Sequence, residues 1–197
     1  MDEVDIIKQA QTGNLSAFNQ LVMAYQGTAY NVAYRVIGNR DAAADATQDA
    51  FLKAYKAIKQ YQGGSFRSWL LRIVTNTCYD QLRYKSRRPT TSLEDLTENP
   101  DDHSDRLISQ TERPEERVLR RELNQLIQIG IETLPDDQRL VLVLSDVQGF
   151  SYQEIAEIID QPLGTVKSRL SRGRRRLRDF LWTQQELLPN QFRLNDE

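Results

Sequence analysis

The residues best suited to chemistry lie between Thr165 and Arg178, where the sequence reads TVKSRLSRGRRRLR. Seven of these fourteen side chains are cationic, and none is acidic. Like charges one helical turn apart, such as Arg169 and Arg172, disfavour an isolated helix by roughly a few tenths of a kcal/mol per pair. A bound polyanion would relieve that repulsion and release condensed counterions. We therefore expect this segment to bind a nucleic acid.

A helical wheel divides this basic segment into two faces. At about 100° per residue, one side is apolar or lacks a side chain: Leu163, Val166, Leu170, Gly173, Leu177 and Leu181. The other side carries Ser168, Arg169, Arg172, Arg175 and Arg176. Duplex DNA is the preferred ligand, because a helix fits its major groove and arginine can contact guanine through two hydrogen bonds. A solvated face, RNA and an anionic membrane surface are the alternatives. Arg174 lies near the apolar edge and needs an acidic partner or a path to solvent.

The residues before the basic segment predict a second helix that pairs with it. Ser151–Glu154 fits a capping box, in which the serine hydroxyl and the glutamate carboxylate each satisfy a backbone N–H. Residues 160–162 interrupt that helix, and Pro162 suits the first turn of the next one. Two helices joined by a tight turn form a helix-turn-helix.

One apolar run upstream allows two interpretations. Residues 140–144, LVLVL, contain β-branched side chains that would also suit a strand. Residues 135–137, PDD, are a good helix start, and no second strand-like run is available for pairing. We therefore expect a fully buried helix that ends at Gly149.

The N-terminal half also has apolar residues at helical spacing. Two amphipathic helices are indicated, with Asn14 and Asp41 as the polar residues that cap their N-termini. Residues 62–65, QGGS, then break the pattern before a third helix from Phe66 to Tyr84. A fully α-helical fold follows from this periodicity.

Two groups of side chains in the N-terminal half have spacings suited to binding. Asp45, Gln48, Asp49 and Leu52 form a polar stripe at i, i+3, i+4 and i+7. Aromatic and cationic side chains alternate further on, a pattern expected of a surface that holds phosphates and stacks unpaired bases. The latter group contains Tyr61, Phe66, Trp69, Arg83, Tyr84, Lys85, Arg87 and Arg88. Solvation of the stripe, and burial of Phe66 and Trp69 in the core, are the competing interpretations.

Composition limits the functions available to this chain. The 197 residues carry a net formal charge of only −2, and their 39% hydrophobic content suffices for one or two small cores. Cys78 is the single cysteine and His103 the single histidine, so a disulfide and a Cys/His zinc site are excluded within one chain. With no nucleophile–base arrangement or phosphate-binding glycine loop, we expect neither an enzyme nor a cofactor. No apolar run approaches the roughly 20 residues of a membrane span, and we expect a cytoplasmic protein.

Four sequence stretches, taken in order, resemble the extracytoplasmic-function class of bacterial RNA polymerase sigma factors. They are DATQDAFLKAYKAI, FRSWLLRIVTNTCYDQLRYKSRR, LPDDQRLVLVLSDVQGFSYQEIAEII and PLGTVKSRLSRGRRRLR. The resemblance implies two small helical domains, a region 2 at residues 1–88 and a region 4 at residues 115–182. Between them lies an acidic linker, residues 89–114, and residues 183–197 form a tail without a recognisable motif.

The same resemblance assigns roles to the residues already described. The stripe would grip the clamp helices of the polymerase largest subunit, and region 4 would contact the flap. The loop at residues 60–65 would capture a base flipped from the minus 10 promoter element. The adjoining minus 10 surface would comprise Tyr61, Gln62, Ser65, Phe66, Asn76, Arg83, Lys85, Arg87 and Arg88.

The C-terminal basic helix would recognise the minus 35 element as duplex. Lys167, Ser168, Ser171 and Arg172 would contact bases and nearby phosphates, and Thr165, Arg169, Arg175 and Arg176 would position the DNA backbone. An anti-sigma factor, commonly membrane-anchored, would be a further partner. The competing hypothesis is a helix-turn-helix regulator that binds duplex DNA without polymerase.

Overall fold

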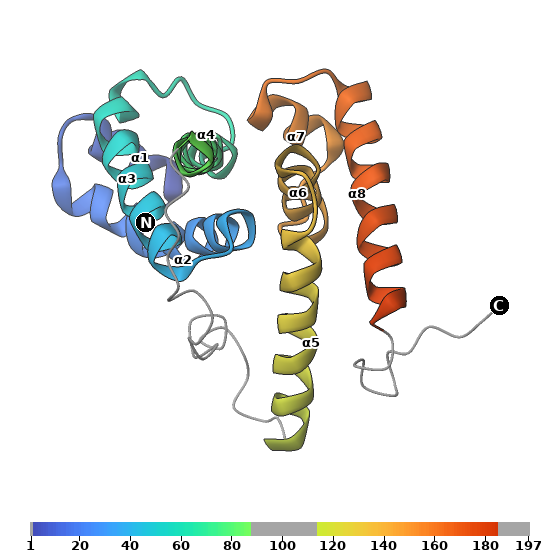
Figure 1. Ribbon diagram of the computed structural model, residues 1–197. Coiled ribbons are helices and arrows are strands. Elements are labelled where there is room, and N and C mark those ends of the chain that lie inside the picture. Colours follow the sequence, from blue (N-terminus) through green and yellow to red (C-terminus); the bar gives the residue numbers. More distant parts are fainter. Residues whose placement is uncertain (1, 88–113, 185–197) are drawn as a thin grey trace.

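The computed structural model describes residues 2–87 and 114–184, and helices dominate both ranges (Figure 1). Neither range contains a β-strand, which confirms the all-α prediction. The linker and the tail that we predicted lie almost entirely outside the described residues. None of the described helices is both long enough and apolar enough to cross a membrane.

The N-terminal half consists of four α-helices and one short turn of 3₁₀-helix. These are α1 (Glu3–Gln11), α2 (Leu15–Ile37), α3 (Arg40–Ala57), η1 (Ile58–Gln60) and α4 (Phe66–Arg87). The packing is mutual: α2 contacts α1, α3 and α4, and α3 also packs on α4. Small side chains such as Ala43, Ala46 and Ala50 are fully buried and allow α3 to approach its neighbours closely.

The helix starts in this half match one predicted cap and correct the other. Asn14 caps α2, where its side-chain oxygen accepts a hydrogen bond from the backbone N–H of Ala17. At α3 the capping residue is Asn39, which accepts from the N–H of Ala42 at 2.9 Å. Asp41, the cap that we predicted, lies inside the first turn. Asn39 takes this role because its backbone is extended, as the residue before a helix requires, and its short amide reaches the exposed N–H.

The C-terminal half contains α5 (Pro114–Glu132), α6 (Asp136–Leu142), a π-helical turn η3 (Val143–Val147), α7 (Tyr152–Ile159) and α8 (Leu163–Thr183). Residues 140–144 are helical and buried, as predicted. The capping box at Ser151 and Glu154 is present. Pro162 lies just before α8 rather than in its first turn.

The two faces of α8 match the wheel at most positions, and Leu163 and Arg169 are the exceptions: Leu163 is exposed and Arg169 is half-buried. Val166, Leu170 and Gly173 are buried, whereas Leu163, at the first turn, is exposed. A Cβ atom at Gly173 would lie 3.3 Å from the carbonyl oxygen of Gln138. The glycine therefore allows α8 to pack closely on α6.

The two halves are in contact with each other. α4 packs on α7, and α2 packs on α5, α6 and η3. In Figure 1, α5, α6, α7 and α8 accordingly stand beside the N-terminal helices. Buried apolar side chains from both halves form one continuous cluster.

Candidate nucleic-acid interface

The outward face of α8 presents most of the predicted minus 35 residues to solvent. Lys167, Ser168, Ser171, Arg172, Arg175 and Arg176 are exposed, and Thr165 and Arg169 are half-buried. A shallow depression beside this face is lined by Tyr152, Lys167, Ser171, Arg174, Arg175 and Arg178. The sequence motif therefore becomes a continuous cationic surface at the side of α8 that does not pack on the core.

Arg172 is folded along its own helix. Its Nε donates to the carbonyl oxygen of Ser168 at 3.1 Å, and its Nη2 donates to the Ser168 hydroxyl at 3.3 Å. The guanidinium is thereby held over the exposed face. Both acceptors belong to a neutral residue, so a guanine edge or a phosphate can replace them.

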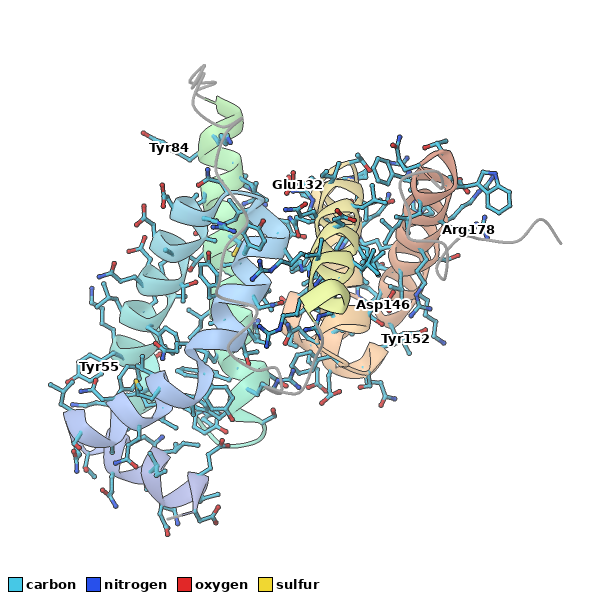
Figure 2. All side chains as sticks on the ribbon, turned by 90° about the horizontal axis from the view of Figure 1, so that it is seen from below. Tyr55, Tyr84, Glu132, Asp146, Tyr152 and Arg178 are labelled. Atoms are coloured by element: carbon cyan, nitrogen blue, oxygen red, sulfur yellow. The ribbon has the colours of Figure 1, made fainter. Side chains whose placement is uncertain are left out.

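Two acidic residues outside α8 hold arginines of that helix in place. Arg174 forms two hydrogen bonds with Asp146 of η3, from Nε at 3.0 Å and from Nη2 at 2.6 Å. These hydrogen bonds are the main reason that the pKa of Arg174 is raised. Asp146 and Tyr152 lie near each other beside the C-terminal helices in Figure 2. Arg174 therefore has an acidic partner, one of the two outcomes that its place on the wheel predicted, and half of its side chain is also exposed.

Arg169 has a comparable partner on α6. Its Nε lies 2.9 Å from a carboxylate oxygen of Asp137, and only 23% of its side chain is exposed. Asp137 and Asp146 were not among the predicted site residues. Their only sequence signal was a negative charge in the two segments before the basic helix.

The loop between η1 and α4 is shaped by its two glycines. Gly63 and Gly64 have φ angles of +101° and +90°, a left-handed conformation that other residues rarely adopt. The hydroxyl of Tyr61 donates to the carbonyl oxygen of Gly64 at 2.7 Å and closes the loop. Gln62 and Ser65 are exposed, and the Ser65 hydroxyl accepts from the N–H of Ser68 at the start of α4.

An aromatic cluster lies beneath this loop. The Tyr61 ring centroid is 5.3 Å from that of Trp69 and 5.7 Å from that of Phe66, and Tyr25 adds a fourth ring at 5.4 Å from Phe66. Phe66 is only 2% exposed, so its ring is part of the core. In this structure Phe66 supports Tyr61 and Trp69 from within and presents no face for a base. Trp69 is partly buried against the same core.

The remaining predicted minus 10 residues follow α4 toward its end. Asn76, Arg83 and Lys85 are exposed. Tyr84 is 62% exposed, and Figure 2 shows it projecting from the free end of α4. The side chain of Arg87 and the whole of Arg88 lie outside the described residues.

The predicted stripe on α3 is fully accessible. Asp45, Gln48, Asp49 and Leu52 are all exposed, and Leu52 retains 53% of its accessible surface. Tyr55, one turn further, is also exposed and packs edge-on against Phe18 with ring centroids 5.0 Å apart. Tyr55 extends the stripe, although the sequence analysis did not include it. Its i+3 spacing from Leu52 was the available signal.

No metal site is apparent where the structure can be described. Among residues 2–87 and 114–184, no three Asp, Glu, Cys or His side chains gather closely enough to hold an ion. Cys78 is buried, and its burial raises the pKa of the thiol to about 12. A buried, protonated thiol on α4 packs as a small apolar side chain.

The family of the chain follows from two matched segments. Residues 21–88 match the family Sigma-70 region 2, and residues 124–177 match Sigma-70, region 4. Together they cover more than half of the chain and include both the α3–α4 surface and the α7–α8 pair. The chain belongs to the sigma-70 family, in its extracytoplasmic-function class. A sigma factor is a non-catalytic specificity subunit of RNA polymerase, so no active site is expected here.

Relatives of this sigma factor match over nearly its whole length. It is 38% identical to the ECF RNA polymerase sigma-E factor of Escherichia coli K12 over 170 residues, which are 86% of this chain and 88% of that one. It is 36% identical over 167 residues to the ECF RNA polymerase sigma factor SigE of Mycolicibacterium smegmatis, covering 85% of this chain and 62% of that one.

Two solved structures share the fold. The sigma factor RpoE of Bartonella quintana, bound to the anti-sigma factor NepR, is 27% identical with a TM-score of 0.65, and the match covers 85% of this chain and 98% of that one. CnrH, bound to the cytosolic domain of CnrY, is 27% identical with a TM-score of 0.64, and the match covers 91% and 96% of the respective chains.

Proposed function

We propose that this sigma factor binds core RNA polymerase and directs it to promoters by recognising the minus 10 element as a melted strand and the minus 35 element as duplex. In this proposal, residues 1–88 form region 2 and recognise the minus 10 element, and residues 115–182 form region 4 and recognise the minus 35 element. The observation that carries the proposal is the combination, within one sigma-family chain, of a cationic outward face on α8 and an exposed loop before α4 beside partly exposed aromatic rings.

The arrangement of α8 supports duplex recognition. Its apolar side packs on α6 and α7, so its exposed side is free to enter a major groove. Lys167, Ser171 and Arg172 lie along the middle of that side, the position from which side chains reach base edges. Arg175 and Arg176 lie one turn further and suit phosphate contacts. Asp146 and Asp137 hold Arg174 and Arg169 in fixed directions, which lowers the entropy lost when DNA binds.

The loop at residues 60–65 supports capture of an unpaired base. Its exposed glycines leave room for a nucleotide, and Tyr61 and Trp69 supply partly exposed aromatic rings beside it. Extrusion of a base from a duplex costs a few kcal/mol, so a loop already shaped by the Tyr61–Gly64 hydrogen bond is an advantage. Asn76, Arg83 and Lys85 continue from this loop along α4 and would hold the strand.

Two protein partners follow from the same arrangement. The α3 stripe offers carboxylates beside exposed Leu52, which suits a helical partner with basic and apolar side chains. We propose that this partner is the clamp-helix element of the polymerase largest subunit, with a second contact from region 4 to the flap. A cognate anti-sigma factor is the further partner that we propose, because the solved RpoE chain is bound to one.

Run-off transcription with core RNA polymerase over a promoter library tests the proposal directly. We expect transcripts only when the chain is added, from promoters that share sequences near positions −10 and −35. Absence of core binding, together with sequence-specific binding to duplex DNA, would instead establish the polymerase-independent regulator.

Charge reversal in the stripe tests the polymerase contact. Asp49→Lys should weaken binding to core polymerase by about tenfold or more, because it places a cation where a basic partner surface is expected. Asp49 is exposed, so the variant should keep its thermal stability. Affinity is measured by fluorescence titration with labelled sigma factor, and Asp5→Lys on α1 is the control with the same change in charge. Equal affinities of the two variants would show that the stripe is not the interface.

A further inference from the structure

One side chain of α1 bridges the turn that leads into the loop at residues 60–65. The amide nitrogen of Gln11 donates to the carbonyl oxygen of Ile58 at 3.2 Å and to that of Tyr61 at 2.8 Å. Ile58 is the first residue of η1, and Tyr61 is the residue that caps its end. The N–H of Tyr61 also donates to the Ile58 carbonyl, at 3.1 Å. Gln11 therefore holds both ends of a turn that lies 47 to 50 residues further along the chain.

A primary amide is well suited to this bridge. Its NH₂ group has two donors, one for each carbonyl. The last carbonyls of a helix have no intrahelical N–H to accept from, and α3 passes into η1 and ends at this turn. Gln11 is itself half-buried, so water replaces its hydrogen bonds only in part if the donors are removed. The amide therefore favours one backbone geometry of the turn over others.

The helix that carries Gln11 is fixed near both of its ends. Ile7 and Ala10 are buried, and they share a helical face with Gln11 because the three residues are spaced at i, i+3 and i+4. Near the start of α1, Glu3 accepts a hydrogen bond from the hydroxyl of Tyr25 on α2. α1 packs on α2 and also contacts η1. The Gln11 amide therefore has a defined position relative to the core of the N-terminal half.

Tyr61 carries this constraint into the loop. Gln11 holds its backbone carbonyl, and its own hydroxyl donates to the carbonyl oxygen of Gly64 at 2.7 Å. Its ring centroid lies 5.3 Å from that of Trp69. Burial and the negative charge of Glu3 raise the pKa of the Tyr61 hydroxyl, so it remains a protonated donor to Gly64 at neutral pH. The segment from residue 61 to residue 64 is therefore held at both of its ends.

We propose that Gln11 is a positioning residue for capture of the unpaired base, because it fixes the backbone from which Tyr61 enters the loop. In this proposal Gln11 contacts no DNA and acts only through Tyr61. Its ordering of the loop rests on the contacts above, whereas its effect on promoter binding rests on the proposed function. Without the bridge, only a fraction of the chains would hold the loop in the capturing shape. The apparent affinity for the melted strand would fall by that fraction.

A purely structural role for Gln11 predicts a different pattern of losses. If the amide only joined α1 to the end of α3, its removal would lower the stability of the chain and weaken every DNA contact alike. A positioning role predicts a loss that depends on the presence of the captured base. The two roles are therefore separated by DNA that has or lacks that base.

Fluorine NMR on the free chain tests whether Gln11 orders the loop. Trp69 and Trp182 are the two tryptophans, so labelling with 5-fluorotryptophan gives two signals. Gln11→Met removes both donors from a side chain of similar length, and it should shift or broaden the Trp69 signal without changing the Trp182 signal. Gln11→Lys, whose ammonium group can donate to both carbonyls, should restore the Trp69 signal. An unchanged Trp69 signal in Gln11→Met would overturn the inference.

Fork DNA tests the effect of Gln11 on base capture. Core polymerase and the full chain are combined, and the holoenzyme is titrated with a labelled promoter whose minus 10 segment is single-stranded on the non-template strand. Abasic sites, introduced one at a time, identify the captured base with the parent chain. We expect Gln11→Met to bind the intact fork about fivefold or more weakly, and to bind the fork that lacks this base as well as the parent chain does. Gln20→Met, at an exposed position of α2, is the matched control and should bind both forks like the parent.

The outcomes separate the positioning role from the proposed function. Recovery of fork affinity in Gln11→Lys would support the positioning role. Equal losses by Gln11→Met on the intact and the abasic fork would overturn it. If no abasic site weakens binding of the parent chain, base capture itself is wrong, and with it the role of Gln11 at the promoter. The fluorine signals then decide only whether Gln11 orders the loop.

Discussion

Arg172 of α8 hydrogen-bonds to its own helix in the free chain, and in the proposed function it contacts DNA. Its guanidinium is bound to the carbonyl and hydroxyl of Ser168 and remains exposed. The side chain therefore lies along its own helix, over the exposed face. Arg176, one turn further along α8, is also exposed and suits a phosphate contact. The two residues should consequently contribute to binding in different ways.

Alanine substitutions should separate these two roles. Arg172→Ala should reduce discrimination between a cognate and a mismatched minus 35 duplex by about 1–3 kcal/mol, if it contacts a base through two hydrogen bonds. Arg176→Ala should weaken binding to both duplexes equally. It should also lower, by about one, the magnitude of the slope of log binding constant against log salt concentration. Fluorescence anisotropy at several salt concentrations measures both effects. An equal loss on both duplexes for Arg172→Ala would make Arg172 a phosphate contact.

The thiol of Cys78 should be unreactive in the folded chain. Burial raises the pKa of its thiol to about 12 from the ordinary value of 9.0, so the thiol stays protonated at neutral pH. We expect no reaction with a disulfide reagent at pH 8 until the chain is unfolded by urea. Above pH 9 the unfolded chain loses this proton and the folded chain keeps it, so folding stability should fall between pH 9 and pH 12. Cys78→Ala should lack that component of the pH dependence, and rapid reaction of the native chain would contradict the burial.

At the scale of elements, Arg139 links α6 to three other segments. It donates to the carbonyl oxygens of Ile131 and Leu134 at 3.1 and 2.9 Å, and to that of Val36 on α2. Arg139 also donates a fourth hydrogen bond, to the carbonyl oxygen of Glu132. The side chain is only 10% exposed. One planar guanidinium therefore satisfies carbonyls at the end of α5, in the loop before α6 and at the end of α2.

Replacement of this residue should destabilise the fold markedly. Arg139→Lys should lower the free energy of unfolding by about 3 kcal/mol, because an ammonium group cannot reach four carbonyls in a planar arrangement. Urea unfolding followed by circular dichroism measures the change. Arg175→Lys, at an exposed position of α8, is the matched control and should have little effect. An unchanged urea midpoint for Arg139→Lys would show that the four hydrogen bonds contribute little.

At the scale of the whole molecule, charge is distributed unevenly despite the net value of −2. Cations are concentrated on the outward face of α8 and the end of α4, and the exposed carboxylates of the stripe lie on α3. Other arginines are used internally: Arg35, Arg67 and Arg139 each donate a hydrogen bond from one half of the chain to the other. Burial is the main cause that lowers the pKa of Arg35. A sequence count treats all of these arginines as equivalent, but only the folded chain divides them between exposed positions and positions within the fold.

The sequence alone determined the helices, the family and the two faces of α8. These features depend on local periodicity and on side chains near each other in the chain, such as Ser151 with Glu154. It did not determine that Phe66 is buried beneath the loop, or that Asp146 and Asp137 hold arginines of α8. Those outcomes depend on how distant segments pack, which periodicity does not specify.

Contact between the two halves was decided only by the tertiary structure. Arg139 and Val36 are separated by 103 residues, and nothing in either local sequence indicates that they meet. The contact joins the guanidinium of Arg139 on α6 to a backbone carbonyl near the end of α2, and every residue possesses such a carbonyl. Backbone acceptors carry no sequence signal, so this contact between the two halves becomes visible only once the chain is folded.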